Sequence, residues 1–257
     1  MDEEQNYCFG INPILEKLKA SPNDIFEILI ARGSSAPALR GVDAQARSLG
    51  LCVKYVLPGL LDRLSNGQRH QGVLAKVVAY SYSPFSGLLE IIPSFSGLAW
   101  LLILDGLTDP RNFGALLRIA ESVGIRHVVI PKDRTVAVTP TVVKASAGAV
   151  HHLKIYRAVN LRRAISQIKE LGFWVVGLDA TAPEGIYDRV YPERLGIVLG
   201  SEGAGIRPLI LRECDYIASI PMKGRIASLN VAAAGAVFLY ELLRQARSRI
   251  DKGETNG

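Results

Sequence analysis

Short apolar runs alternate with segments of helical spacing from residue 99 to the end of the chain. The apolar runs predict strands over residues 101–105, 127–131, 173–179, 195–200 and 216–221. The segments between them predict helices over residues 109–124, 139–150, 160–172 and 206–214, and one more helix closes the region. Strands that alternate with helices indicate an α/β fold with a mainly parallel sheet that is covered on both faces.

The first 80 residues show a separate and smaller α/β pattern. It predicts strands over residues 25–31, 51–57 and 72–80 and a helix over residues 37–50. Residues 81–98 are rich in Ser, Pro and Gly and have no period, which is typical of a linker, although residues 88–92 could pair with a strand. We therefore expect an N-terminal domain (1–80), a linker (81–98), a second domain (99–250) and a polar tail (251–257).

Composition favours an ordinary globular chain, since 49% of the residues are hydrophobic. No apolar run approaches the roughly 18 residues of a membrane helix. The acidic N-terminus lacks the basic and apolar regions of a secretory signal. The three cysteines are far apart and match no spacing of metal ligands, which favours a reduced, cytoplasmic protein without a metal.

The net charge of +6 adds a preference for polyanions such as nucleic acids. Most of the excess lies after residue 80, and its densest part runs from Lys154 to Lys169 and includes Arg157, Arg162 and Arg163. A solvated helix face explains this cluster equally well.

Ligands of parallel sheets bind beyond the carboxyl ends of the strands, and a glycine-rich loop, Gly200 to Gly205 (GSEGAG), lies at one such end. It departs from the G-x-G-x-x-G pattern of dinucleotide sites and lacks the lysine of a Walker loop. Glu202 would repel a phosphate, which favours a neutral or cationic ligand or an arginine partner. The alternative is an ordinary glycine-rich turn.

Further candidate site residues lie near the start of the helix predicted over residues 109–124. Asp109 is expected to cap the helix that contains Asn112 and Arg118. Arg118 lies on a largely apolar helix, so it needs a partner such as Glu202 unless it extends into solvent.

The last helix is expected to begin at Ser228, a good N-cap, which leaves Asn230 unexplained in the first turn. The small residues that follow, VAAAGAV (231–237), indicate close packing against a loop, a cofactor or another subunit.

These three stretches resemble the motifs of the SpoU/TrmH branch of the SPOUT methyltransferases. The motifs are NFGALLR (112–118), GSEGAG (200–205), and IPMKG (220–224) followed by SLNV (228–231), in the family's order and spacing. In the first 80 residues, FGINPILEKL and HQGVLAKV resemble the RNA-binding domain of the subgroup that methylates a guanosine ribose of 23S ribosomal RNA. The resemblance covers nearly the whole chain.

The resemblance implies a C-terminal SPOUT domain with a deep trefoil knot, a homodimer through that domain, and S-adenosylmethionine as cofactor. By the same resemblance, the cofactor-binding residues are Leu178, Leu199, Gly200, Ser201, Gly203, Ile220, Met222, Ser228 and Leu229. The catalytic residues are Asn112, Arg118, Glu202, Ser228 and Asn230. A guanidinium is a poor base, so Arg118 is expected to stabilise the developing alkoxide of a ribose 2′-hydroxyl while the others orient the reactants.

The N-terminal domain would select the RNA, either 23S ribosomal RNA or an assembling large subunit, with Arg69, His70 and Arg118 as RNA-binding candidates. Three alternatives remain: a tRNA 2′-O-methyltransferase, a non-catalytic ribosome assembly factor, and a nucleotide-binding dehydrogenase. The missing dinucleotide fingerprint disfavours the last of these.

Overall fold

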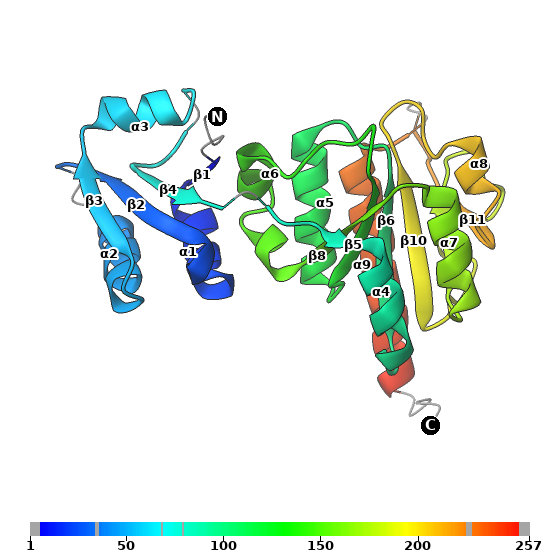
Figure 1. The fold of residues 1–257 in the computed structure, drawn as a ribbon. Coiled ribbons are helices and arrows are strands. Elements are labelled where there is room, and N and C mark those ends of the chain that lie inside the picture. The colour runs from blue at the N-terminus through cyan, green and yellow to red at the C-terminus, as the bar shows by residue number, and fades with distance from the viewer. Residues whose placement is uncertain (1–5, 34–35, 68, 79, 225–227, 252–257) are drawn as a thin grey trace. The chain divides into compact units, whose positions relative to one another are not determined.

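The chain folds into two compact units in a computed structural model that describes residues 6–33, 36–67, 69–78, 80–224 and 228–251 (Figure 1). Unit 1 contains residues up to Ser81 together with Val138–His152, and unit 2 contains Tyr82–Ala137 and the residues from Leu153 onward. The expected division near residue 80 is thus present, but a later segment also belongs to unit 1. The predicted polar tail lies outside the described residues except for Asp251.

Unit 1 is a four-stranded sheet with helices. Its strands are β1 (Asn6–Phe9), β4 (Val73–Val77), β2 (Ile25–Ala31) and β3 (Cys52–Val56), in this order across the sheet. Its helices are α1 (Ile11–Ala20), α2 (Pro37–Ser48), α3 (Pro58–Leu64) and α6 (Pro140–Ala145), with short 3₁₀ turns η1 (Pro22–Asp24) and η3 (Ala149–His152). The predicted strands and the predicted helix are confirmed, but β1, α1 and α3 have no counterpart in the prediction.

The helix predicted over residues 139–150 is too long. It ends at Ala145, because Ala147 and Gly148 adopt left-handed backbone conformations with φ of 52° and 88°. A Cβ on Gly148 would lie 2.6 Å from the Cβ of Glu16 in α1, so the backbone passes too close to α1 for a side chain. This close approach fixes Val138–His152 in unit 1.

Unit 2 is built on a seven-stranded sheet in which every neighbouring pair is parallel. The strands, in order across the sheet, are β11 (Tyr216–Ala218), β9 (Trp174–Leu178), β10 (Arg194–Gly200), β6 (Ala99–Asp105), β7 (His127–Pro131), β8 (Lys154–Ala158) and β5 (Ser83–Pro84). The central strands β6 and β10 are almost entirely buried, as continuous apolar runs predict.

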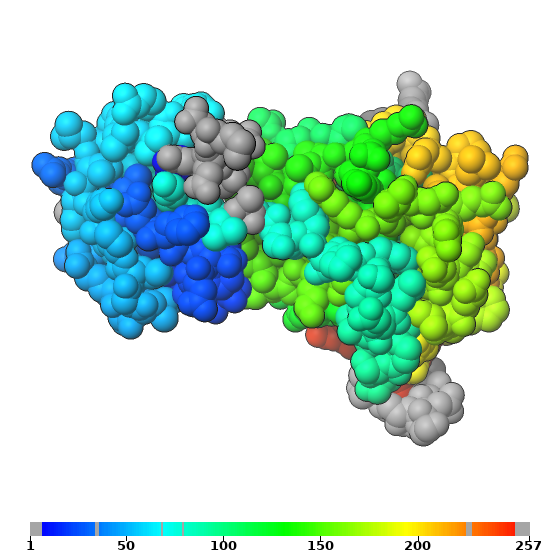
Figure 2. All heavy atoms as spheres, in the orientation of Figure 1, coloured from blue at the N-terminus to red at the C-terminus, as the bar shows by residue number. Residues whose placement is uncertain are grey.

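Helices cover both faces of this sheet. One face packs against α4 (Phe85–Ile91), α7 (Leu161–Glu170) and α8 (Pro208–Leu211), and α4 and α7 form much of the surface in the space-filling view (Figure 2). On the other face, α5 (Pro110–Ser122) packs against α9 (Val231–Asp251). A Cβ on Gly235 of α9 would lie 2.5 Å from Leu116 of α5 and 3.0 Å from Leu199 of β10. The small residues of α9 therefore permit the close packing that the sequence indicates.

The expected linker is wrong for most of residues 81–98. This segment contains β5, α4 and the 3₁₀ turn η2 (Ile92–Ser94), and Leu88 and Ile92 are fully buried in the core of unit 2. Arg194 donates hydrogen bonds to the carbonyl oxygens of Phe95 and Ile92. Burial of the apolar side chains between the Pro and Ser residues outweighs a composition that is typical of loops.

The helix predicted over residues 206–214 and the strand predicted over 216–221 are shorter in the structure, at Pro208–Leu211 and Tyr216–Ala218. The helix starts at Pro208 because the backbone of Arg207 is extended, with ψ of 140°, and its N–H is bound to the carboxylate of Asp105. The strand loses its partner after Ala218, where Ser219 bridges to Gly185 instead.

Candidate functional site

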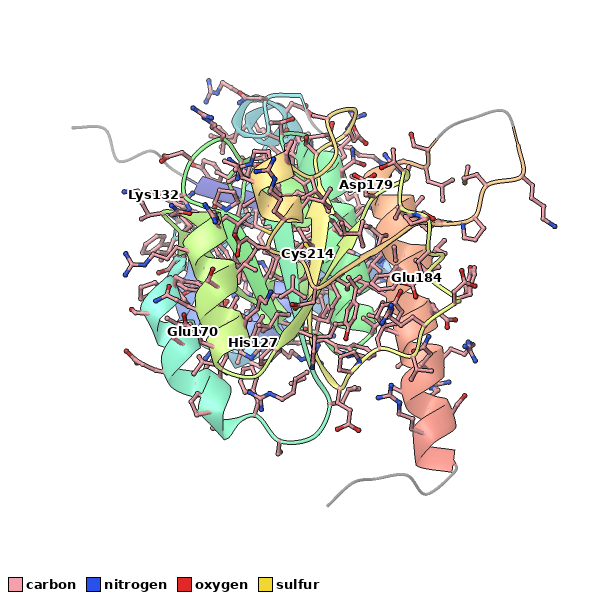
Figure 3. All side chains as sticks on the ribbon, turned by 90° about the vertical axis from the view of Figure 1, so that its right-hand side faces the viewer. His127, Lys132, Glu170, Asp179, Glu184 and Cys214 are labelled. Carbon is pink, nitrogen blue, oxygen red and sulfur yellow. The ribbon has the colours of Figure 1, made fainter. Side chains whose placement is uncertain are left out.

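A cavity of about 550 Å³ opens at the carboxyl ends of β9, β10 and β11. It lies where ligands of parallel sheets bind, and Figure 3 shows one of its residues, Asp179, beside the start of α9. The lining includes all nine residues predicted to bind the cofactor: Leu178, Leu199, Gly200, Ser201, Gly203, Ile220, Met222, Ser228 and Leu229. The structure thus brings together residues from four separate segments of the chain.

The glycine-rich loop closes on itself. Ser201 and Gly205 exchange two backbone hydrogen bonds of 3.0 and 2.9 Å, so these N–H groups are not available to a phosphate. A Cβ at residue 200 would lie 2.0 Å from the carbonyl carbon of Gly205, which makes glycine obligatory there. Gly203 and Gly205 have φ of 77° and 66°, which favours glycine at both positions. The loop is therefore a tight wall of the cavity and not a phosphate cradle.

Three of the predicted catalytic side chains meet at this wall. The amide of Asn230 donates to Glu202 Oε1 at 2.6 Å and to Asn112 Oδ1 at 3.0 Å. The amide of Asn112 also donates to Glu202 Oε1. Asn112 comes from the first turn of α5, where Asp109 accepts hydrogen bonds from the N–H groups of residues 111 and 112 as predicted. Glu202 Oε2 has no hydrogen bond to any residue that the structure describes, so it is free to interact with a ligand.

The predicted pairing of Arg118 with Glu202 is wrong, because the described residues show no ion pair or hydrogen bond between these two side chains. The amides of Asn112 and Asn230 bind one oxygen of this carboxylate instead. Arg118 is exposed and, within the described part of the chain, makes no hydrogen bond or ion pair. It lies six residues beyond Asn112, which is about 9 Å along the helix and about 240° around it. Its guanidinium does not line the cavity of this chain.

Asn230, and not Ser228, is the N-cap of the last helix. The helix begins at Val231, and Asn230 Oδ1 accepts hydrogen bonds from the N–H groups of Ala232 at 2.9 Å and Ala233 at 3.3 Å. Asparagine is a poor residue inside a helix but one of the best caps, and this distinction could have identified it from the sequence. Ser228 is exposed and lines the cavity.

The RNA-binding candidates Arg69 and His70 belong to unit 1. His70 Nε2 lies 2.9 Å from Asp62 Oδ1, and His70 Nδ1 accepts from the N–H of Gly72 at 3.1 Å. The carbonyl oxygen of Arg69 accepts a hydrogen bond from Lys144 at 2.8 Å, while its side chain is exposed. Both ring nitrogens of His70 thus hold its own loop together, which leaves Arg69 as the better RNA-binding candidate of the two.

The pair formed by Asp105 and Arg207 was not predicted from the sequence. Asp105 ends β6, is 1% exposed, and accepts from Arg207 N at 2.9 Å and Arg207 Nε at 2.8 Å. The pair fixes the chain that leaves the glycine-rich loop. An acidic residue after a buried strand and an arginine shortly after a glycine-rich loop are the only sequence signals for it.

No group of three or more His, Cys, Asp or Glu side chains among the described residues is arranged to hold a metal ion. None of the helices in the described ranges is both long enough and apolar enough to span a membrane.

Two family models match the chain. Residues 99–240 match the SpoU rRNA Methylase family, and residues 7–83 match the domain described as RNA 2′-O ribose methyltransferase substrate binding. Among curated proteins, a putative TrmH family tRNA/rRNA methyltransferase, YacO of Bacillus subtilis, is 37% identical over 95% of this chain and 98% of its own length. The 23S rRNA (guanosine-2′-O-)-methyltransferase RlmB of Xylella fastidiosa is 36% identical over the same shares.

Solved structures show the same fold. The SpoU methyltransferase AviRb from Streptomyces viridochromogenes, in complex with the cofactor AdoMet, superposes with a TM-score of 0.79 at 23% identity, over 95% of this chain and 91% of its own. A structure described as an RNA 2′-O ribose methyltransferase has a TM-score of 0.76 at 26% identity, over 93% and 88% of the two chains.

Proposed function

The chain belongs to the SpoU rRNA Methylase family, and we propose that it transfers the methyl group of S-adenosylmethionine to a guanosine ribose 2′-hydroxyl of 23S ribosomal RNA. One observation carries the proposal: the cavity that contains all nine predicted cofactor residues adjoins the cluster of Asn112, Glu202 and Asn230. A binding site and orienting groups therefore occur side by side.

The cavity fits this cofactor. Leu178, Leu199 and Leu229 offer apolar surface to an adenine, and the absent side chain at Gly200 keeps the loop closed beside it. The exposed carboxylate of Glu202 suits a ligand that carries a positive sulfonium. When bound, S-adenosylmethionine supplies an electrophilic methyl group to the site.

The chain's own residues orient the Glu202 carboxylate and stabilise the negative charge that develops on the ribose. The two amides fix one oxygen of Glu202, which holds the carboxylate in a single orientation at the rim of the cavity. Arg118 is exposed and free of partners in the described chain, so its guanidinium is available to the RNA. A guanidinium stays protonated, and its role is to stabilise negative charge as the 2′-hydroxyl loses its proton.

The RNA substrate follows from the N-terminal part of the chain. The match to a substrate-binding domain over residues 7–83 supports a selective RNA, and relatives with 36–37% identity over 95% of the chain include enzymes named for 23S rRNA. We further propose a cytoplasmic homodimer that forms through the C-terminal domain, and the trefoil knot stays a prediction from the resemblance. A tRNA substrate is the second candidate, since the B. subtilis relative is named for both RNAs.

Methyl transfer to different RNAs distinguishes the candidate functions. Purified protein with labelled S-adenosylmethionine is incubated with unmodified 23S ribosomal RNA, with total tRNA, or with large-subunit precursor particles. We expect label in the ribosomal RNA or the particle. Label in tRNA alone would retain the chemistry and reject the substrate. No label in any RNA, together with no cofactor binding, would favour a non-catalytic assembly factor.

A further inference from the structure

A second cleft in unit 2, of about 690 Å³, lies at the carboxyl ends of the strands, as the cofactor cavity does. Its walls are the chain segments that follow β7 and β8 and the start of α8. The lining residues that matter here are Arg134, Val159, Arg162, Arg207 and Leu209, with Asp133 as the single acidic one. None of them belongs to the cofactor cavity.

Two of the three arginines, Arg162 and Arg207, are fixed by ion pairs with carboxylates. Arg207 uses Nε and Nη2 to bind Asp105, which is buried, yet its side chain is 50% exposed. Arg162 uses Nε to bind Glu213 at 2.7 Å, and its side chain is 61% exposed. Each guanidinium keeps further N–H donors that do not bind the carboxylate. Such pairing fixes the side chain in advance and reduces the entropy lost when a ligand binds.

Arg134 is exposed and, among the described residues, forms no ion pair. Its φ of 57° is in the left-handed region, which costs an ordinary residue about 1 kcal/mol or more. The following residues anchor this conformation, because Thr135 Oγ1 and Val136 N both donate to the carbonyl oxygen of Leu107, at 3.1 and 2.8 Å. The loop thus holds an unpaired cation at the mouth of the cleft.

The cleft is within reach of a strand of RNA that has its ribose at the cofactor cavity. Gly200 of β10 pairs with Asp105 of β6, and β7 and β8 follow β6 in the sheet. With about 4.8 Å between strands, β8 lies about 14 Å from β10, a distance that a few nucleotides span. In Figure 3, Lys132 and Asp179 lie toward one end of the unit, and His127 and Glu170 lie toward the other.

We propose that this cleft binds the sugar–phosphate backbone of the substrate RNA, a few nucleotides from the methylated ribose. Arginine forks match phosphate oxygens, and the lining of the cleft contains three arginines and a single carboxylate, that of Asp133. Val159 and Leu209 are 83% and 57% exposed at its rim, and they offer apolar cover to a ribose or base. This proposal rests on the proposed function for its RNA substrate and assigns residues to it that no sequence motif contains.

The test compares one double variant and one single variant with a matched control. Arg134→Ala/Arg162→Ala removes two contacts, Arg134→Ala alone removes the side chain that has no structural partner, and Arg126→Ala removes an exposed, ion-paired arginine just before β7, at the opposite edge. Filter binding to a 23S ribosomal RNA transcript is measured over a range of salt concentrations. S-adenosylmethionine affinity and thermal unfolding serve as controls for an intact fold.

We expect the double variant to bind the transcript at least about tenfold more weakly, with a salt slope lower by about 1.4, because each single-strand phosphate contact contributes about 0.7. Arg134→Ala is expected to lower the slope by about 0.7, and Arg126→Ala to leave it unchanged. Unchanged affinity and slope in both cleft variants, or an equal loss in Arg126→Ala, would overturn the proposal. Binding is measured without methyl transfer, so an inactive wild-type protein would count against the function and not against the cleft.

Discussion

At the scale of single residues, the site depends on one carboxylate shared by two amides. Asn112, Glu202 and Asn230 meet although the two asparagines are 118 residues apart in the chain. The motif resemblance predicted these residues, but local spacing could not predict their partners. Charge alone favoured Arg118 for Glu202, whereas the fold directs Arg118 away and satisfies Glu202 with uncharged donors.

The charge of Glu202 is expected to contribute to cofactor affinity through the sulfonium. Glu202→Gln keeps an oxygen for the two amide donors and removes the negative charge. We expect S-adenosylmethionine to bind about two- to fivefold more weakly, because an exposed charge pair contributes roughly 0.5–1 kcal/mol. S-adenosylhomocysteine, whose sulfur is neutral, should bind unchanged. Calorimetric titration of both ligands checks this, and an equal loss for both would show that Glu202 acts only through the loop.

Asn230 combines two roles that two variants separate. Asn230→Ser keeps an oxygen to cap α9 but removes the amide that donates to Glu202 and Asn112. Its free energy of unfolding should lie within about 0.5 kcal/mol of the wild-type value, whereas that of Asn230→Ala should be lower by about 1 kcal/mol. Both variants should lose methyl transfer. Denaturant unfolding and a transfer assay check this, and full activity of Asn230→Ser would remove the amide from the mechanism.

Arg118 is expected to act on the transition state and not on the cofactor. Arg118→Ala should bind S-adenosylmethionine as the wild type does, because this side chain lies outside the cavity. Transfer should fall by about 100-fold or more, the usual cost of losing a donor to a developing oxyanion. Arg118→Lys, which keeps the charge, should retain part of the rate. Loss of cofactor binding in Arg118→Ala would contradict this role.

At the scale of elements, buried strands were the most predictable part of the chain. The runs that became β6, β7 and β10 are long, apolar and bounded by turn residues. Short elements were missed where their own sequence opposes them. The first turn of α1 contains Asn12-Pro13, a turn signal, and α4 lies among Ser, Pro and Gly. Their helical state depends on burial against residues that are distant in the sequence.

The turn after β10 gives a prediction at this scale. Gly200→Ala would place a Cβ 2.0 Å from the backbone of Gly205, so the whole glycine-rich loop must move. We expect cofactor affinity to fall by at least about tenfold, since the displaced loop forms a wall of the cavity. Gly59→Ala is the control, because its Cβ would meet none of the described atoms within 4 Å, its φ is not left-handed, and it lies outside the three motifs. Equal affinities of the two variants would contradict this account of the loop.

At the scale of the whole molecule, the division into units is only partly visible in the sequence. The boundary near residue 80 coincides with a change of composition, but Val138–His152 belongs to unit 1 with no such change. Its place is fixed by packing of α6 and η3 against β1 and α1, which local patterns do not encode.

The half-buried His127 predicts acid sensitivity of the fold. Burial lowers the pKa of His127 in unit 2 from 6.5 to about 4, with a smaller effect from Lys154. Between these two pKa values the unfolded chain binds a proton at this histidine and the folded chain does not. The free energy of unfolding therefore decreases as pH falls from about 6.5 to about 4.

His127→Phe should lose less unfolding free energy than the wild type over this window, whatever its stability at neutral pH. The two tryptophans, Trp100 and Trp174, both lie in unit 2. Their fluorescence during denaturant unfolding therefore reports the unfolding of the unit that contains His127. Identical losses in the variant and the wild type would remove His127 from the explanation.

The identity of the methylated nucleoside tests the central claim most directly. Unmodified 23S ribosomal RNA is incubated with the purified protein and labelled S-adenosylmethionine, digested to nucleosides and separated by chromatography with mass detection. We expect the label in 2′-O-methylguanosine alone. Label in a base-methylated nucleoside would contradict it.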